Sequence, residues 1–171
     1  MGYTIITCVN QKNVIGNNGD LLYHIKNDMI NFKSMTTDNV VIMGRKTFES
    51  LPNMKPLPNR INIIITHDEN YNIMQDDNVF IVNSIQDAKE LCETLFSDKE
   101  WFVIGGSSIY NEFLKENLVS EMRVTYIADD ADGDTIFPSI NNDEWKTYYA
   151  SSIQHDEKTD KNFVYKVLKK K

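Results

Sequence analysis

The chain is organised around the stretch Val40-Val41-Ile42-Met43-Gly44-Arg45-Lys46-Thr47-Phe48-Glu49-Ser50-Leu51, in which an apolar run ends at a glycine and two cations follow. This order predicts a buried strand that turns directly into a helix. Unpaired backbone N–H groups at the start of such a helix, beside Arg45 and Lys46, favour an anion, and phosphate is the first candidate. A strand–helix turn with solvated basic residues is the alternative.

A second cation lies a short way downstream. Three prolines between residues 51 and 60 interrupt regular structure, and Arg60 stands where the next apolar run, Ile61 to Thr66, begins. The region therefore offers two separate cationic sites.

Length and composition limit the class of protein. The chain has 171 residues, 41% of them hydrophobic and 25% charged, which suits one globular domain spanning residues 1–171. A net charge of −7 argues against a nucleic-acid partner. No apolar run approaches the roughly 20 residues of a membrane span, and the N-terminus does not resemble a signal peptide. We expect a cytoplasmic protein without a membrane partner.

The cysteines and histidines give no metal-binding pattern. Cys8 lies in an apolar strand and Cys92 on the apolar face of a helix, so buried free thiols are expected. The three histidines show no paired spacing, and we expect no metal.

The order of apolar runs predicts the fold class. Helical and strand periodicities alternate along the first two thirds of the chain, and strands without an intervening helix follow. The prediction is a single-domain α/β fold with helices on both faces of a predominantly parallel mixed sheet and an antiparallel C-terminal edge strand. The expected strands are 3–9, 40–43, 61–66, 79–82, 101–104, 122–128, 145–153 and 163–168, and the expected helices cover 25–35, 85–95 and 109–114.

Residues 10–22 form a long connection that is rich in Asn and Gly. It contains one apolar pair, Val14-Ile15, which would anchor it against the domain. Long irregular loops in compact domains are often functional, so we interpret this one as a lid; a mobile surface loop is the alternative.

An acidic residue stands on an apolar helix face. Ile25, Met29, Phe32 and Met35 form one stripe at helical spacing, and Asp28 falls inside it. A buried carboxylate needs a partner, and no Lys or Arg shares the stripe, which favours a cationic or amide-like ligand. An Asp at the edge of the stripe, bonded to backbone or water, is the alternative.

A second strand–glycine–helix junction follows at residues 101–114. The apolar run 101–104 leads into Gly105-Gly106-Ser107-Ser108, and helical spacing resumes at Ile109. Glycines allow a ligand to approach the backbone closely, and the hydroxyl groups with the helix N–H groups suit a diphosphate.

Together these motifs resemble one family, the dihydrofolate reductases, and most closely their bacterial type. The resemblance rests on Val14-Ile15-Gly16, Asp28 with Phe32, the run from Val41 to Ser50, Leu57-Pro58-Asn59-Arg60, Ile104-Gly105-Gly106 with Tyr110, Thr125, Gly133-Asp134-Thr135 and Phe137-Pro138. It covers nearly the whole chain in order.

The resemblance implies reduction of 7,8-dihydrofolate to 5,6,7,8-tetrahydrofolate, with hydride transfer from NADPH to C6 and protonation at N5, in support of one-carbon and thymidylate metabolism. It implies a monomer whose partners are dihydrofolate and antifolate-like small molecules. Asp28 would bind the pterin and favour its protonated form, Thr125 would bond to Asp28, and Tyr23, where the family usually has Trp, would keep a polar group for an active-site water.

The same resemblance assigns two sets of binding residues. The substrate set is Ile6, Asp28, Met29, Phe32, Leu51, Lys55, Leu57, Arg60, Ile104, Tyr110 and Thr125. The cofactor set is Cys8, Val14, Ile15, Gly16, Asn17, Asn18, Gly19, Asp20, Leu21, Gly44, Arg45, Lys46, Thr47, Thr66, His67, Ile104, Gly105, Gly106, Ser107, Ser108, Ile109 and Tyr110.

Two other functions stay open at this point. A pyrimidine reductase of riboflavin synthesis would also use NADPH, although Asp28 and Arg60 suit a pterin and a glutamate better. A non-catalytic folate- or NADPH-binding protein is the second alternative, because Leu22-Tyr23 alters the end of the lid.

Overall fold

The computed structural model describes residues 2–73 and 76–171. Its elements follow the alternation that the sequence predicts. In chain order they are β1 (Tyr3–Val9), β2 (Val14–Asn17), β3 (Asp20–Leu21), α1 (Lys26–Thr36), β4 (Val40–Gly44), α2 (Arg45–Glu49), the 3₁₀ turn η1 (Pro52–Met54), β5 (Ile61–Ile65), β6 (Val79–Val82), α3 (Ile85–Leu95), β7 (Trp101–Gly105), α4 (Ser107–Lys115), β8 (Val119–Ile127), β9 (Thr135–Ile136), β10 (Trp145–Ala150), β11 (Gln154–Asp156) and β12 (Lys161–Lys170).

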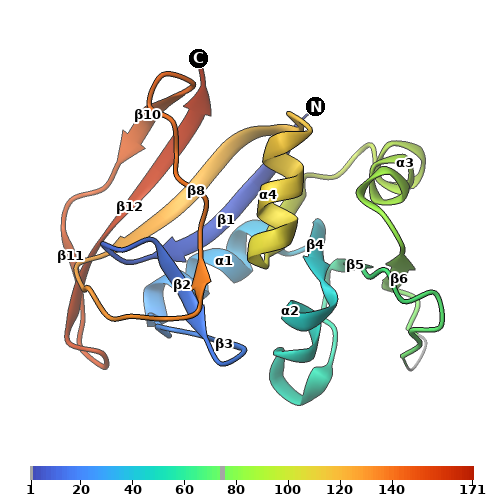
Figure 1. Cartoon of the computed structure of the whole chain (residues 1–171), viewed down its shortest axis with the longest axis horizontal. Helices are drawn as coiled ribbons and strands as arrows, with labels where there is room; N and C mark the ends of the chain where they lie inside the picture. The colour runs from blue at the N-terminus through green and yellow to red at the C-terminus, as the bar shows by residue number, and fades with distance from the viewer. Residues whose placement is uncertain (1, 74–75) are drawn as a thin grey trace.

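The main sheet has the strand order β10-β12-β8-β1-β7-β4-β5-β6, with β11 also paired to β12 (Figure 1). All neighbours from β8 to β6 are parallel, and β12 runs antiparallel to β8. The predicted mixed sheet is confirmed, and β1 lies in its interior, between β8 and β7. The C-terminal strand is antiparallel, but it lies inside the edge because β10 and β11 pair along its outer side.

Strand β4 shows why both faces of the sheet are covered. Val40 and Ile42 belong to a core cluster with side chains of α3 and α4, whereas Val41 and Met43 belong to a second cluster with Phe48 of α2. Side chains alternate across a strand, so a run that is apolar at every position needs an apolar layer on each side. In Figure 1, α3 and α4 lie in front of the sheet and α1 lies behind it.

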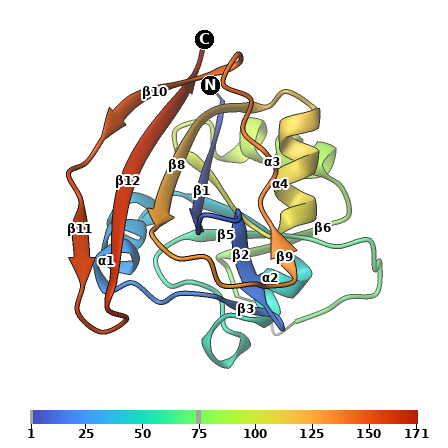
Figure 2. The same cartoon turned by 60° about the vertical axis from the view of Figure 1, so that its left-hand side comes forward.

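The predicted irregular loop 10–22 is wrong in part. Residues 14–17 and 20–21 form β2 and β3, and β2 pairs with β9 in a small three-stranded sheet, visible in Figure 2. Val14 and Ile15 are buried, as the anchoring interpretation requires. The strands are very short, and β2 depends on a partner far away in sequence, so local periodicity does not reveal them.

Candidate active site

Asp28 lies in the first turn of α1 and contacts β8. The Thr125 hydroxyl donates a hydrogen bond to Asp28 Oδ1. Asp156 of β11 helps to fix the start of the helix, because its Oδ1 accepts a hydrogen bond from Lys26 N at 3.2 Å. Burial raises the pKa of the Asp28 carboxyl group, and the Thr125 bond opposes this shift by favouring the charged form. The structure thus joins Asp28 and Thr125 as the family resemblance implies.

Cys8 of β1 lies beside this pair. Its register partner in the parallel β1–β8 ladder is Thr125. Burial raises the pKa of the Cys8 thiol, and the nearby Asp28 charge raises it further. The thiol is therefore neutral and unreactive at neutral pH, and Cys8 acts as a small apolar side chain.

Most of the predicted substrate wall forms one apolar group. Ile6, Leu51, Leu57 and Ile104 are all partly buried and pack against the core cluster on the α1–α2 face of the sheet. Met29, on α1, is half exposed. These side chains come from β1, α1, β7 and the segment after α2, so distant parts of the chain supply the predicted wall.

Arg60 is the buried cation of this site. It is 5% exposed, its Nε donates to Pro58 O at 2.9 Å, and its Nη1 donates to Thr36 Oγ1 at 3.4 Å. Its guanidinium carbon lies 6.0 Å from the centre of the Phe32 ring. No carboxylate pairs with Arg60 within residues 2–73 and 76–171, and burial lowers the pKa of its guanidinium group. Such a cation suits an anionic ligand.

Asn62 is a positioning residue that the sequence reasoning missed. Its Oδ1 accepts from Leu57 N at 2.9 Å, and its Nδ2 donates to Leu57 O at 3.0 Å and to Arg60 O at 3.1 Å. These bonds fix the turn that carries Leu57 and Arg60. The sequence contains one sign of this role, because Asn62 is a polar residue within the apolar run of β5. The structure shows that its amide is fully buried, and a buried amide needs hydrogen-bond partners.

The two strand–glycine–helix junctions lie next to each other. Strands β4 and β7 pair in parallel, so α2 and α4 both begin at the same edge of the sheet. A Cβ added to Gly44 would lie 3.1 Å from Ile109 Cγ1, and one added to Gly105 or Gly106 would lie 3.4 Å from Thr47 Oγ1. Gly105 has φ +129°, a conformation that favours glycine. The predicted phosphate and diphosphate sites are therefore one continuous region.

Cationic and polar residues flank this region at α2. Arg45 is held by Glu49 at 2.7 Å and by Asp68 at 3.3 Å, and its guanidinium carbon lies 4.3 Å from the centre of the Tyr71 ring. Thr66 Oγ1 accepts from Asp68 N at 3.2 Å. The remaining cofactor candidates here, Lys46, His67 and Ser108, are exposed.

The Tyr23 hydroxyl bonds to two residues at the base of the predicted lid, Asn10 and Asp129. It donates to Asp129 and accepts from Asn10 Nδ2 at 3.3 Å. Burial and the Asp129 bond raise the pKa of Tyr23 to about 12. Asn10 Oδ1 also accepts from Val14 N at 3.1 Å, so these bonds anchor the base of the predicted lid. Lys161 completes the group with an ion pair to Asp129 at 3.0 Å.

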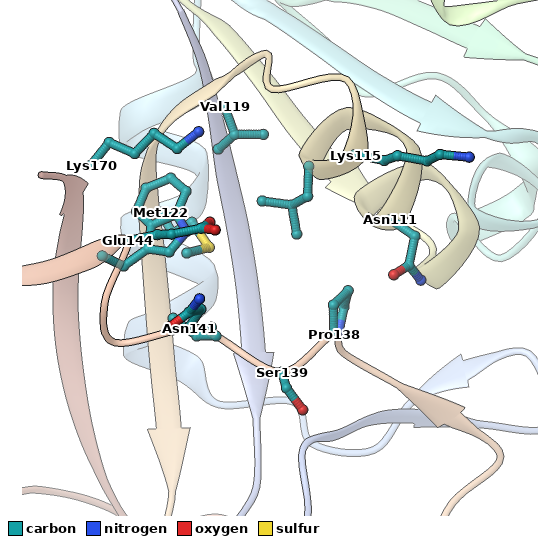
Figure 3. Close-up of a pocket in the computed structure, with 12 residues that line it drawn as sticks. Asn111, Lys115, Val119, Met122, Pro138, Ser139, Asn141, Glu144 and Lys170 are labelled. Carbon is teal, nitrogen blue, oxygen red and sulfur yellow. The ribbon is translucent and has the colours of Figure 1, made fainter.

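Among the cavities of the described part of the chain, two are well defined by their lining residues. One, of about 250 Å³, includes both Asp28 and Thr125, and we call it the Asp28 cavity; its lining residues are Asn27, Asp28, Asn31, Thr125, Tyr149, Ser151, Gln154, Phe163 and Tyr165. The other, of about 310 Å³, lies between α4 and the segment carrying Pro138 and Asn141 (Figure 3). Its described lining includes no predicted site residue.

Two further features are missing from the described part of the chain. Among the residues with described positions, no group of three His, Cys, Asp or Glu side chains is arranged to hold a metal ion. None of the described helices has the length and apolar character needed to cross a membrane.

The two cysteines, Cys8 and Cys92, are free thiols, as the sequence predicts.

Comparison with known proteins adds independent evidence. The family model described as dihydrofolate reductase matches residues 3–170. Among the similar curated proteins, the dihydrofolate reductase of Staphylococcus haemolyticus is 34% identical over 98% of this chain and 95% of its own. The Buchnera aphidicola enzyme of the same name is 36% identical over 99% of both. A solved dihydrofolate reductase from Enterococcus faecalis, complexed with NADP(H) and RAB-propyl, superposes with a TM-score of 0.85 at 28% identity and covers 99% of this chain and 96% of its own.

Proposed function

The chain belongs to the dihydrofolate reductase family and reduces 7,8-dihydrofolate to 5,6,7,8-tetrahydrofolate with NADPH, and we propose that Asp28, Thr125 and Arg60 are its principal substrate-binding side chains. The family predicted from the sequence is thereby confirmed. The observation that carries the residue assignment is the partly buried Asp28 carboxylate, which accepts a hydrogen bond from Thr125 and lies on the helix that covers the face of the sheet with the apolar wall.

Asp28 binds the pterin and stabilises its protonated form. A buried carboxylate without a cation beside it favours a ligand that brings a positive charge or paired N–H donors. The raised pKa of Asp28 favours the sharing of one proton between the carboxyl group and the bound substrate. Water is the immediate donor of the proton to N5. Thr125 holds Asp28 in place and favours its charged form.

The rest of the substrate lies along the apolar wall. Phe32 and Leu57 flank the ring system and the benzoyl group, and the buried Arg60 binds the glutamate carboxylate through its planar guanidinium group. Lys55 is exposed and supplies a screened charge near the same end. The other wall residues are Ile6, Met29, Leu51 and Ile104. Tyr110 belongs to the core cluster on the opposite face of the sheet, and its hydroxyl reaches this side by donating to Ile6 O at 2.8 Å.

The adjoining glycine junctions fit NADPH. Small residues at Gly44, Gly105 and Gly106 leave the backbone N–H groups of α2 and α4 open to a diphosphate. Arg45, Lys46, Thr47, Thr66 and His67 hold the adenosine end. NADPH, when bound, supplies the hydride that is added to C6 of dihydrofolate. The lid residues 14–21 cover the nicotinamide half, and Tyr23 anchors that lid through Asn10.

We also propose the setting in which this activity operates. Residues 1–171 act as one domain and as a monomer, in support of one-carbon metabolism. Two free thiols, Cys8 and Cys92, suit a reducing compartment, which supports a cytoplasmic location.

The direct test of activity uses purified protein with NADPH and dihydrofolate. We expect loss of absorbance by the reduced nicotinamide only when both substrates are present. Binding of both without turnover would support the non-catalytic folate- or NADPH-binding alternative. Turnover of a pyrimidine intermediate of riboflavin synthesis, without turnover of dihydrofolate, would support the other reductase.

A further inference from the structure

Asp28 stands between two different spaces. At about 100° per residue, Asn27 and Asn31 lie to one side of Asp28 on α1 and Phe32 lies to the other. Both asparagines line the Asp28 cavity, whereas Phe32 faces Arg60 in the proposed substrate site. The carboxyl group therefore borders a cavity on the side of the helix away from the substrate.

The Asp28 cavity is suited to water. Its lining includes the polar side chains of Asn31, Ser151, Gln154 and Tyr165, and its volume is about 250 Å³. One water molecule takes up about 30 Å³ of the liquid and needs two to four polar partners. The cavity thus has both the room and the hydrogen-bonding groups for several molecules.

None of the side chains that line the Asp28 cavity in the described part of the chain carries a positive charge, so solvent must stabilise the charge of the carboxylate. No Lys, Arg or His lines the Asp28 cavity among the described residues. Tyr149 of β10 and Tyr165 of β12 line it, and Cys8 of β1 lies beside the carboxyl group. Arg123 of β8 reaches Tyr165 Oη at 3.4 Å and does not line the cavity.

We propose that water in the Asp28 cavity solvates the Asp28 carboxylate from behind while substrate covers its other side, and that the short side chain of Asn31 leaves room for this water. The inference rests on the proposed function of Asp28. It identifies a route from solvent to the carboxyl group that does not pass the lid, whose anchoring residue Tyr23 is bonded to Asp129.

The pH dependence of hydride transfer reports on this water. The substrate complex that has lost its shared proton carries one more negative charge than the reactive complex. Removal of water disfavours that charged state, so the shared proton is retained to higher pH. Hydride transfer requires the protonated complex, and its rate therefore falls at a higher pH once the cavity is filled.

The test fills the cavity with Asn31→Phe. The pH profile of single-turnover hydride transfer is expected to move upward by about half a unit or more, which is roughly a threefold faster reaction at a fixed pH above the midpoint. The plateau at low pH should stay within about twofold of wild type. Asn31→Ala, which keeps the cavity open, and Ile30→Phe, which adds bulk on the exposed face of α1, should both keep the wild-type midpoint.

A second readout does not depend on turnover. Titration of the carbon-13-labelled Asp28 carboxyl group by NMR should give a higher pKa in Asn31→Phe than in wild type or Asn31→Ala. If wild type is inactive, the proposed function fails, and this titration still decides the solvation claim. Gln154→Phe fills the same cavity from β11 and replaces Asn31→Phe if that variant does not fold. An unchanged Asp28 pKa in the filled variants, or a lowered plateau with an unmoved midpoint, overturns the inference.

Discussion

The Thr125 hydroxyl donates a hydrogen bond to the Asp28 carboxylate, and this contact joins α1 to β8 across 97 positions of sequence. It places a carboxyl group of raised pKa beside the apolar wall that we assign to the substrate. Burial raises that pKa and the hydrogen bond lowers it, and the effect of burial is the larger of the two.

Removal of the hydroxyl should shift this balance. Thr125→Val keeps the shape of the side chain and removes a bond that favours the charged form, so the pKa of Asp28 should rise. We expect kcat/KM for dihydrofolate to fall about tenfold, the effect of losing one hydrogen bond to a charged group. NMR titration and steady-state kinetics measure the two effects. Thr147→Val, on the exposed face of β10, is the control and should change neither.

Asp28 is expected to reduce stability while it serves function. Because burial raises its folded-state pKa above the unfolded value, the folded protein binds more protons between the two values, and stability falls as pH rises through that window. Asp28→Asn should therefore raise the melting temperature at neutral pH. The difference should disappear below about pH 3.9, where both states are protonated. A neutral-pH melting temperature at or below that of wild type would contradict this account.

Arg60 should act on the glutamate tail alone. Arg60→Met removes a charged hydrogen-bond donor, and we expect KM for dihydrofolate to rise about 10- to 100-fold. A dihydropterin substrate without the glutamate tail should be reduced equally well by wild type and variant. Lys55→Met, at an exposed position, should have a much smaller effect on KM. An equal rise in KM for dihydrofolate and for the tail-less dihydropterin would contradict the assignment of Arg60 to the glutamate tail.

Asn62 should support the same site indirectly. Asn62→Ala leaves three hydrogen bonds to the Leu57 and Arg60 backbone unmade, so the free energy of unfolding should fall by about 2 kcal/mol or more. Denaturant unfolding measures this change. KM for dihydrofolate should rise because the turn that carries Arg60 loosens. Asn78→Ala, at an exposed position, is the matched control. Unchanged stability and KM would show that the turn keeps its conformation without the Asn62 hydrogen bonds.

Local patterns in the sequence predict much of this fold. The runs Tyr3–Val9 and Val79–Val82 have the bounds of β1 and β6, and the predicted helix 85–95 has the bounds of α3. The position of Asp28 inside an apolar stripe identifies the carboxylate from helical spacing alone. For β1 and α3, burial sets the periodicity, so the sequence records it. The stripe of α1 is only partly covered by the protein, since Met29 is half exposed.

Contacts between distant segments are what the patterns omit. Two examples are the pairing of β2 with β9 and the hydrogen bond that Asp156 accepts from Lys26 N at the start of α1. Both depend on how loops fold back, which the spacing of residues in the sequence does not show. The three bonds of Asn62 are similar, since a buried amide shows that partners exist without showing which they are. The ligand-binding roles of the individual site residues remain predictions that the variants above test.

The central claim is that Asp28 controls protonation of the substrate, and the pH profile of Asp28→Asn tests it most directly. Single-turnover oxidation of NADPH by dihydrofolate should be slower than wild type by about 100-fold or more at neutral pH, because the amide cannot stabilise a protonated pterin. The rate should recover in part as the pH falls, because solvent then supplies the proton. Rates equal to those of wild type from acidic to alkaline pH would remove Asp28 from the mechanism.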